Sequence, residues 1–306
     1  MQTILGAGGA IGTPLAKELT AYTRDIRLFG RHPEKVNESD QLMTGDLTSA
    51  EDVDRAVTGS AIVYLVAGLQ YDHRVWQQQW QVIMTNVLAA CAKHKAKLVF
   101  FDNIYMIDRD HLGHITETSP IRPSSKKGLV RATLVHMIEE AREAGTVDAM
   151  IVRAADFYGP RVGSSVLQET VYKPFREGKK ANLLADPRHI HTYTFTPDAA
   201  RATAQLGNTP EAFGEDWHLP TTHERLTGKD WIRLFAEEMG VNPGYRVMPG
   251  FLLSLMGLFV PILREMKEMN YQFDRDYVFD SSKFEQRFGW GATDPREGVK
   301  AVVKAG

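Results

Sequence analysis

The sequence contains a single cysteine, Cys91, and no long apolar run. One cysteine cannot form an intrachain disulfide bond, which is typical of proteins in a reducing compartment such as the cytoplasm. Met1 leads directly into a strand-like run without the basic and apolar regions of a secretory signal, so secretion is not expected. The longest apolar stretch, residues 251–263, contains Pro261 and is shorter than the roughly 20 helical residues that a bilayer requires. We therefore expect a cytoplasmic protein that does not span a membrane.

Neither sign of charge dominates. The 306 residues include 36 basic and 38 acidic side chains, a formal net charge of −2. That balance creates no global field for a nucleic acid or an anionic membrane, so we expect neither as a partner. With 43% hydrophobic and 24% charged residues, the composition is that of a folded globular protein and excludes intrinsic disorder. The expected partner is a small molecule. A homodimer is one option. We expect residues 251–263 to form a buried helix or a subunit contact, with a role at a membrane surface or against an apolar substrate as the alternative.

In the first half of the chain, short apolar runs alternate with helical patterns. The runs are largely continuous, as in strands covered on both faces, and lie at residues 3–5, 26–29, 61–66, 98–101 and 149–152. Helical patterns separate them at residues 11–22, 49–57, 74–94 and 129–144. This alternation predicts an α/β fold, a Rossmann-like doubly wound parallel sheet with right-handed crossovers.

The rhythm changes after residue 160. Loops rich in Pro, Gly and His join helices of mixed character, and only brief strands are expected, near residues 193–195 and 217–219. We expect residues 1–160 to form the Rossmann domain, with residues 192–206 returning to it. Residues 161–306 are expected mainly to form a smaller C-terminal lobe on the substrate side.

Three glycines follow the first predicted strand and open the first predicted helix. Gly6, Gly9 and Gly12 have a GxxGxxG spacing in a run that also contains Ala10 and Ile11. At such a junction one glycine allows the tight turn, another lets the backbone approach a pyrophosphate, and a third allows close packing of helix on strand. Amides at the start of the helix favour phosphate groups. We therefore predict a dinucleotide site here; a tight turn without a ligand is the alternative.

The residues after the second predicted strand bear on the choice between NAD and NADP. NAD sites usually carry an acidic side chain about 20 positions after the glycines, where it binds the ribose 2′-hydroxyl. In this sequence Gly30 and Arg31 stand there, followed by His32 and Lys35. A guanidinium binds phosphate through charge-assisted hydrogen bonds, so this segment favours the 2′-phosphate of NADP over NAD. A solvated basic turn is the alternative.

Further segments follow in an order and spacing that are specific only when taken together. Residues 153–160 read Arg-Ala-Ala-Asp-Phe-Tyr-Gly-Pro, and residues 194–198 read Thr-Phe-Thr-Pro-Asp. With the glycine turn, they resemble the extended short-chain dehydrogenase/reductase superfamily, of the NAD-dependent epimerase/dehydratase type. The resemblance implies an oxidoreductase or epimerase. It also implies contacts with the adenosine half of the cofactor for Asp46, Leu47, Val66, Ala67 and Gly68, and identifies Asn86 as the helix asparagine of the family.

The resemblance ends at the catalytic positions. The family carries a serine or threonine after the fifth strand, then a Tyr-x-x-x-Lys pair that opens the next helix. In this sequence Asn103 stands at the serine position, Lys127 at the tyrosine position and Arg131 at the lysine position. The resemblance implies that Arg131 contacts the nicotinamide ribose. Lys127 can donate a proton to a developing alkoxide, Asn103 can hydrogen-bond a carbonyl oxygen, and Tyr105 is the other candidate proton donor.

Three functions stay open at this point. The leading one is an NADP-dependent oxidoreductase or epimerase that acts on a small carbonyl or hydroxyl compound. The alternatives are a non-catalytic NADP(H)-binding sensor, because the usual tyrosine is absent, and a sugar-nucleotide epimerase or dehydratase. The histidine pairs His111/His114 and His189/His191 lack a full ligand set, so we expect no metal site.

Overall fold

The computed structural model describes residues 1–163, 165–183, 185–247, 265 and 268–306. The chain divides into two compact units. Unit 1 comprises Met1–Ile104, Lys127–Arg153 and Ala199–Leu219, and unit 2 comprises Tyr105–Lys126, Ala154–Asp198 and Pro220–Gly306. The apolar stretch at residues 251–263 lies outside the described residues. Of the helices that are described, none is both long and apolar enough to cross a bilayer.

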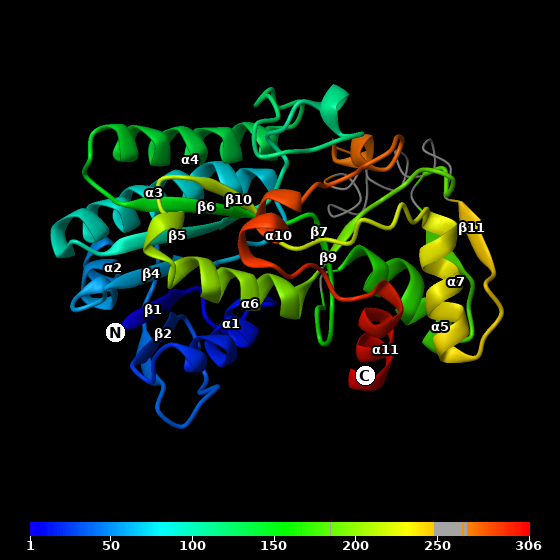
Figure 1. The fold of residues 1–306 in the computed structure, drawn as a ribbon, viewed down its shortest axis with the longest axis horizontal. Coiled ribbons are helices and arrows are strands. Elements are labelled where there is room, and N and C mark those ends of the chain that lie inside the picture. Colours follow the sequence, from blue (N-terminus) through cyan, green and yellow to red (C-terminus); the bar gives the residue numbers. More distant parts are fainter. Residues whose placement is uncertain (164, 184, 248–264, 266–267) are drawn as a thin grey trace. The chain divides into compact units, whose positions relative to one another are not determined.

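Unit 1 is built around a seven-stranded parallel sheet (Figure 1). The strand order is β10-β6-β5-β4-β1-β2-β3. The strands are β1 (Gln2–Leu5), β2 (Ile26–Gly30), β3 (Gln41–Thr44), β4 (Ile62–Leu65), β5 (Lys97–Asp102), β6 (Ala149–Arg153) and β10 (Asp216–His218). Five of them lie at the five continuous apolar runs, and the predicted Rossmann-like fold is confirmed.

Helices cover both faces of this sheet. In Figure 1, α2, α3 and α4 lie over one face, and α1 and α6 over the other. Their bounds are α1 (Gly12–Glu18), α2 (Ala50–Val57), α3 (His73–His94), α4 (Lys126–Glu143) and α6 (Thr196–Gly207), with 3-10 turns at Leu19–Ala21 and Pro210–Ala212. Burial between two helical layers explains why these strands have continuous rather than alternating apolar sequences.

Two strands differ from the sequence-based expectation. β3 was not predicted, because this strand at the edge of the sheet is largely exposed and lacks a continuous apolar pattern. β10 was expected in the smaller lobe, but it pairs with β6 in the central sheet. Of the segment expected to return to the first domain, residues 199–206 belong to unit 1 and residues 192–198 to unit 2.

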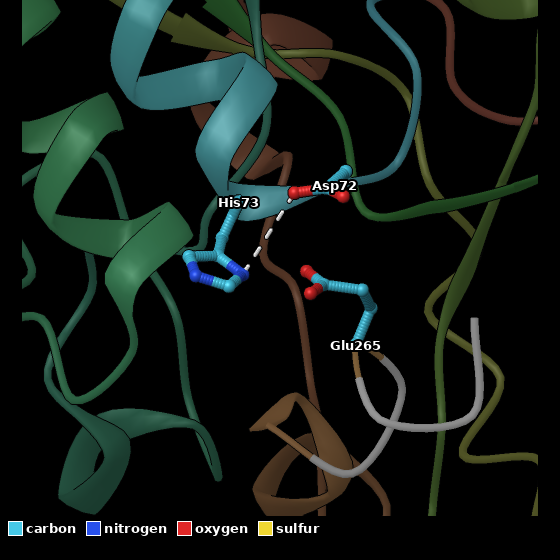
Figure 2. A group of neighbouring side chains, drawn as sticks. All are labelled: Asp72, His73 and Glu265. Carbon is cyan, nitrogen blue, oxygen red and sulfur yellow. Dashed lines mark ion pairs between the residues drawn. The ribbon is translucent and has the colours of Figure 1, made fainter. Parts of the chain in front are cut away.

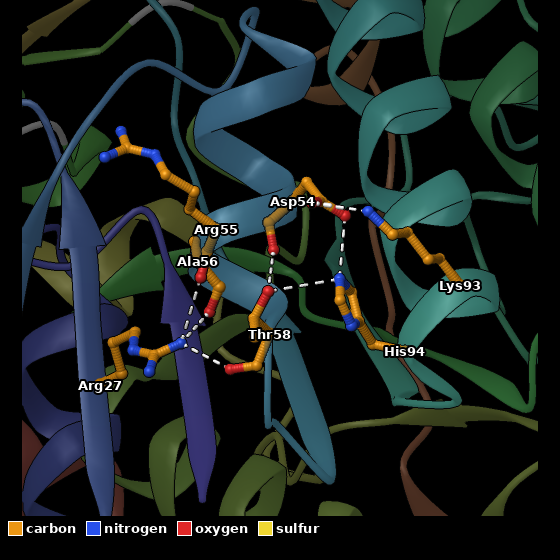
Figure 3. A network of polar contacts seen from close by, with 7 residues as sticks. All are labelled: Arg27, Asp54, Arg55, Ala56, Thr58, Lys93 and His94. Atoms are coloured by element: carbon orange, nitrogen blue, oxygen red, sulfur yellow. Dashed lines mark hydrogen bonds and ion pairs between the residues drawn. The ribbon is translucent and has the colours of Figure 1, made fainter.

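Polar contacts hold the carboxyl end of α2 to its neighbours in unit 1 (Figure 3). Arg27, on β2, donates from Nη1 to the backbone oxygen of Ala56 at 2.6 Å. On the side facing α3, Asp54 accepts from Lys93 Nζ and lies within hydrogen-bond distance of His94 Nε2, both at 2.8 Å. Carbonyl groups in the last turn of a helix lack intrahelical partners, so the guanidinium satisfies one of them.

Unit 2 consists of short elements. β7 (Asp156–Tyr158) pairs with β9 (Tyr193–Phe195), and β8 (Ala181–Leu183) pairs with β11 (Tyr245–Val247), both in parallel. Among the described residues of this unit, helices are formed by α5 (Lys173–Arg176), α7 (Gly228–Met239), α10 (Ser282–Phe288) and α11 (Pro295–Ala305), with a π-helical turn at Gln168–Tyr172 and 3-10 turns at Arg109–His111 and Asn270–Gln272. A mainly aromatic and aliphatic core that includes Tyr158, Tyr193, Trp231 and Phe235 holds them together.

Candidate functional site

The predicted cofactor residues of unit 1 lie where the parallel strands end. Residues 6–12 follow β1, residues 31–32 follow β2, residues 46–47 follow β3 and residues 66–68 follow β4. In a parallel sheet these carboxyl ends lie along one edge. The chain starts at β1 in the middle of the sheet, builds outward to β2 and β3, and then continues from β4 on the other side of β1. Ligands of doubly wound sheets bind at such a switch point.

The glycine turn has the geometry that a dinucleotide requires. Gly6 has a φ of +94°, and a Cβ on it would lie 2.4 Å from the Cα of Ala67. A Cβ on Gly12 would lie 3.0 Å from the backbone oxygen of Gly6, so helix and turn pack closely there. At Gly9 the nearest atom would be 3.7 Å away, which leaves room for a ligand. The sequence analysis missed Gly8, whose φ of +90° is also one that favours glycine.

The amino end of α1 completes this turn. Within α1, which is fully described, no side chain caps the amino end and the first turn carries no acidic residue. The amides of Thr13 and Leu15 already donate to the backbone oxygens of Gly9 and Ile11, so it is mainly the helix dipole at this end that favours an anion. The residues present therefore fit the pyrophosphate of a dinucleotide.

The predicted adenosine-side residues are linked to one another. Asn86, on α3, donates from Nδ2 to the backbone oxygen of Leu47 at 3.1 Å. The carboxylate of Asp46 accepts from the amide and the hydroxyl of Thr48, both at 2.8 Å. These hydrogen bonds lower the pKa of Asp46, and the charge of Arg31 adds to the effect. Arg31 is therefore close enough to the ionised carboxylate of Asp46 for their charges to interact.

Arg131 forms a buried ion pair. Its Nε and Nη2 lie 2.6 and 2.5 Å from Oδ1 of Asp102, the last residue of β5. The two side chains are 4% and 0% exposed. The guanidinium also lies over the rings of Trp80 and Phe100, 4.6 and 4.9 Å from their centroids. The same Asp102 oxygen accepts the backbone amide of Asn103 at 2.8 Å, so Asp102 joins two predicted site residues.

Sequence reasoning missed Asp102. The signal was a carboxylate at the end of a buried strand, together with an arginine at the family's lysine position. Asp102 also faces a second buried guanidinium, because its Oδ2 lies 3.8 Å from Nε of Arg153. Arg153 in turn binds Asp216 at 2.7 Å, which Arg142 also binds at 2.8 Å. Burial alone would raise the pKa of Asp216, but these two arginines outweigh it and lower that pKa.

The other catalytic candidates fall into both units. Lys127, in the first turn of α4, is fully buried, and its Nζ lies 4.4 Å from the ring centroid of Tyr71, a cation–π distance. Asn103 is half-buried and belongs with Lys127 and Arg131 to unit 1. Tyr105 belongs to unit 2, where its backbone oxygen accepts from the hydroxyl of Tyr271 at 3.4 Å. The catalytic roles of these residues stay predictions.

Helix α3, which carries Trp80, begins after the N-cap residue Asp72 (Figure 2). The carboxylate of Asp72 accepts the backbone amide of Arg74 at 2.8 Å, which caps α3. His73 Nδ1 lies 4.0 Å from the same carboxylate. Hydrogen bonds from Arg74 lower the pKa of Asp72, so the cap stays ionised. We assign these side chains to the helix start and propose no metal site.

Comparisons with solved structures show the fold that the chain shares. It is similar to MoeE5 in complex with UDP-glucose and NAD, with a TM-score of 0.81, 17% identity, and coverage of 99% of this chain and 97% of the other. It is also similar to UDP-glucuronic acid 4-epimerase from Bacillus cereus in complex with NAD, with a TM-score of 0.79, 16% identity, and coverage of 100% and 98%. A third is a DesIV double mutant, a dTDP-glucose 4,6-dehydratase from Streptomyces venezuelae with NAD bound, with a TM-score of 0.78, 16% identity, and coverage of 100% and 96%.

Among curated proteins, none matches the sequence. The model of the NAD dependent epimerase/dehydratase family, in contrast, matches residues 3–219. That range contains the glycine turn, the carboxyl edge of the sheet and all the catalytic candidates. The resemblance seen in the sequence is thereby confirmed: the chain belongs to the NAD-dependent epimerase/dehydratase family, a family of enzymes.

Proposed function

We propose that the protein binds a nicotinamide dinucleotide at the carboxyl edge of the unit 1 sheet and uses it to transform a hydroxyl- or carbonyl-bearing compound. The observation that carries this is the glycine turn, where the backbone leaves no room for a Cβ on Gly6, packs tightly against Gly12 and makes only ordinary contact at Gly9. When bound, the dinucleotide supplies hydride exchange at nicotinamide C4. Calorimetric titration with the oxidised and reduced forms of NAD and NADP tests the proposal. It is refuted if the protein binds none of these four dinucleotides.

A sugar nucleotide is the substrate class that the comparisons favour. Structures similar to this chain hold UDP-glucose or UDP-glucuronic acid together with NAD, or are of a dTDP-glucose 4,6-dehydratase. This favours epimerase or dehydratase chemistry over the reduction of a small carbonyl compound, which was the leading sequence-based hypothesis. The test is to incubate the protein with NAD⁺ and each of these three sugar nucleotides and to follow products by chromatography. Conversion of a small carbonyl compound and of none of the three would favour the earlier hypothesis.

The preference for NADP over NAD rests on Arg31 and His32, which are both exposed after β2. A guanidinium contact with a 2′-phosphate is worth roughly 1.5–3 kcal/mol. Arg31→Ala should therefore weaken NADPH binding about 10- to 100-fold and leave NADH binding nearly unchanged. Arg24→Ala, an exposed arginine before β2, is the matched control. The similar structures hold NAD rather than NADP. If the parent protein binds NADH more tightly than NADPH, the proposed preference is overturned.

The residues at the catalytic positions can still move a proton. Lys127 can donate one to a developing alkoxide or stabilise it by charge, and Asn103 can hold a carbonyl oxygen through its amide. Arg131 keeps a permanent positive charge near this point, because a guanidinium does not deprotonate in proteins. Asp102 positions both Arg131 and the loop that carries Asn103.

One observation favours a second candidate function, a non-catalytic dinucleotide sensor. The guanidinium of Arg131, which stands at the family's lysine position, is already held by Asp102 and two aromatic rings. A sensor would bind the dinucleotide and give no turnover with any substrate. Binding without turnover of the three sugar nucleotides or of a carbonyl panel would therefore favour the sensor over the enzyme.

A further inference from the structure

A tyrosine ring lies beside the position at which the family carries its tyrosine. Lys127 stands at that position, in the first turn of α4, and its Nζ lies 4.4 Å from the centroid of the Tyr71 ring. Tyr71 belongs to the segment that leaves the carboxyl end of β4 and leads into α3. Both residues are part of unit 1. A tyrosine and a lysine therefore meet in space, although they are far apart in the sequence.

The backbone next to Tyr71 is fixed by the start of α3. The backbone oxygen of Gln70 accepts from Nε1 of Trp76 at 3.0 Å and from the amide of Asp72 at 2.8 Å. Asp72 is also the residue that caps α3. The rings of Tyr71 and Trp76 meet edge to face, with centroids 6.1 Å apart and an angle of 86° between their planes. These contacts hold the Tyr71 ring next to Lys127.

Lys127 and Tyr71 differ in their exposure. Lys127 has no exposed surface, whereas Tyr71 is only half-buried. A group that transfers a proton has to come within hydrogen-bond reach of the atom that takes it. The buried ammonium group does not meet this requirement in the structure as it stands. The Tyr71 side chain, which keeps accessible surface at the carboxyl edge of the sheet, is the better candidate.

The charges around Tyr71 favour its ionised form. The ammonium group of Lys127 lies over its ring, and an opposite charge within roughly 4–6 Å stabilises an ionised group. The guanidinium of Arg131 lies 5.6 Å from the centroid of Trp76, the ring that Tyr71 contacts. The carboxylate of Asp72 is negative, but Arg74 binds it at 3.0 Å and offsets its charge. Lys127 is therefore placed to stabilise a phenolate at Tyr71.

We propose that Tyr71 is the proton-transfer residue of this enzyme and that Lys127 is its cationic partner. The inference rests on the proposed function, because it needs a substrate oxygen and a nicotinamide dinucleotide. In the oxidising direction the phenolate of Tyr71 takes the proton of the substrate hydroxyl, while the carbon that bears this hydroxyl gives its hydride to the oxidised dinucleotide. Reduction reverses both transfers. Lys127 keeps its own proton throughout and acts through its charge.

The first measurement needs neither a dinucleotide nor a substrate. The full-length protein is labelled with ¹³C at Cζ of tyrosine, whose NMR resonance reports ionisation of the phenol, and Tyr71→Phe identifies the signal of Tyr71. We expect Tyr71 to ionise at a lower pH in the parent than in Lys127→Met, by roughly one unit or more. A purely structural role of Lys127 would not produce this shift. Ionisation at the same pH in both proteins overturns the proposal.

Turnover separates the roles of the two side chains. Loss of a proton-transfer group costs about 10²–10⁴-fold in rate, so Tyr71→Phe should lower kcat by that factor with dinucleotide affinity intact. Tyr22→Phe, at an exposed tyrosine of the same unit, is the matched control. Lys127→Arg keeps the charge but has no proton to give, so it should turn over much faster than Lys127→Met.

Two outcomes of the turnover measurements overturn the proposal. One is near-normal turnover by Tyr71→Phe, and the other is an equal loss in folded Lys127→Arg and Lys127→Met, which would make Lys127 itself the proton donor. A parent protein that converts no substrate would refute the proposed function instead. The titration of Tyr71 then decides by itself whether the two side chains form the pair.

Discussion

Removing the charge of Asp102 tests the buried ion pair that joins β5 to α4. Asp102→Asn keeps the shape of the side chain but leaves the guanidinium of Arg131, 4% exposed, without a charged partner. Arg153 keeps its contact with Asp216 at 2.7 Å, so the loss is concentrated at Arg131. Breaking a buried ion pair by removing one partner costs about 3–5 kcal/mol, because the remaining charge stays buried. We expect the free energy of unfolding to fall by about that amount.

Urea unfolding followed by tryptophan fluorescence measures this change, since Trp76 and Trp80 lie beside Arg131. The matched control is Asp54→Asn, which removes the charge of a partly exposed carboxylate that contacts Lys93 and His94 between two helices of the same unit (Figure 3). Exposed pairs contribute little, so this variant should unfold nearly as the parent does. Adding Arg131→Met to Asp102→Asn should restore part of the lost stability, because an apolar pair carries no buried charge. If Asp102→Asn loses no more stability than Asp54→Asn, the ion pair does not stabilise the sheet as argued.

Three further predictions concern other parts of the chain. Gly6→Ala should lower the melting temperature and abolish dinucleotide binding, because its Cβ would lie 2.4 Å from the Cα of Ala67. Gly68→Ala, with open space around its Cβ, should melt like the parent, and equal melting temperatures of the two variants would count against the close packing at Gly6. Burial would raise the pKa of Asp280, but hydrogen bonds led by that of His114 lower it from 3.8 to about 2. The stability that this carboxylate contributes is therefore present above about pH 4 and is lost as the pH falls toward 2, and His114→Ala should raise the pKa in an NMR titration; an unchanged value would contradict the assignment. Once a substrate is found, Lys127→Met should lower kcat by about 10²–10⁴-fold with dinucleotide affinity intact. Near-normal turnover would instead make Tyr105 the candidate proton donor, and Tyr105→Phe would then test it.

Local patterns in the sequence were sufficient for the central part of the fold. Strands buried on both faces carry largely continuous apolar runs, so β1, β2, β4, β5 and β6 could be located without knowing their neighbours. The glycine turn was equally local, because the conformations that it requires depend on residues that follow one another. β3 could not be found this way, since an exposed edge strand has no apolar pattern. β10 carried a strand-like pattern, but its partner β6 lies far away in the sequence.

Most of the candidate site depended on tertiary structure. The sequence placed Arg131 at the family's lysine position, but the fold brought it to Asp102, 29 residues away, whose carboxylate holds the guanidinium. The fold likewise joined His191, a histidine expected in a loop, to Asp156, 35 residues away, and buried its ring. Periodicity reports which face of an element is buried, and motifs report which residues follow one another. Which charges meet inside depends on how separate elements pack, and that information is not local in the sequence.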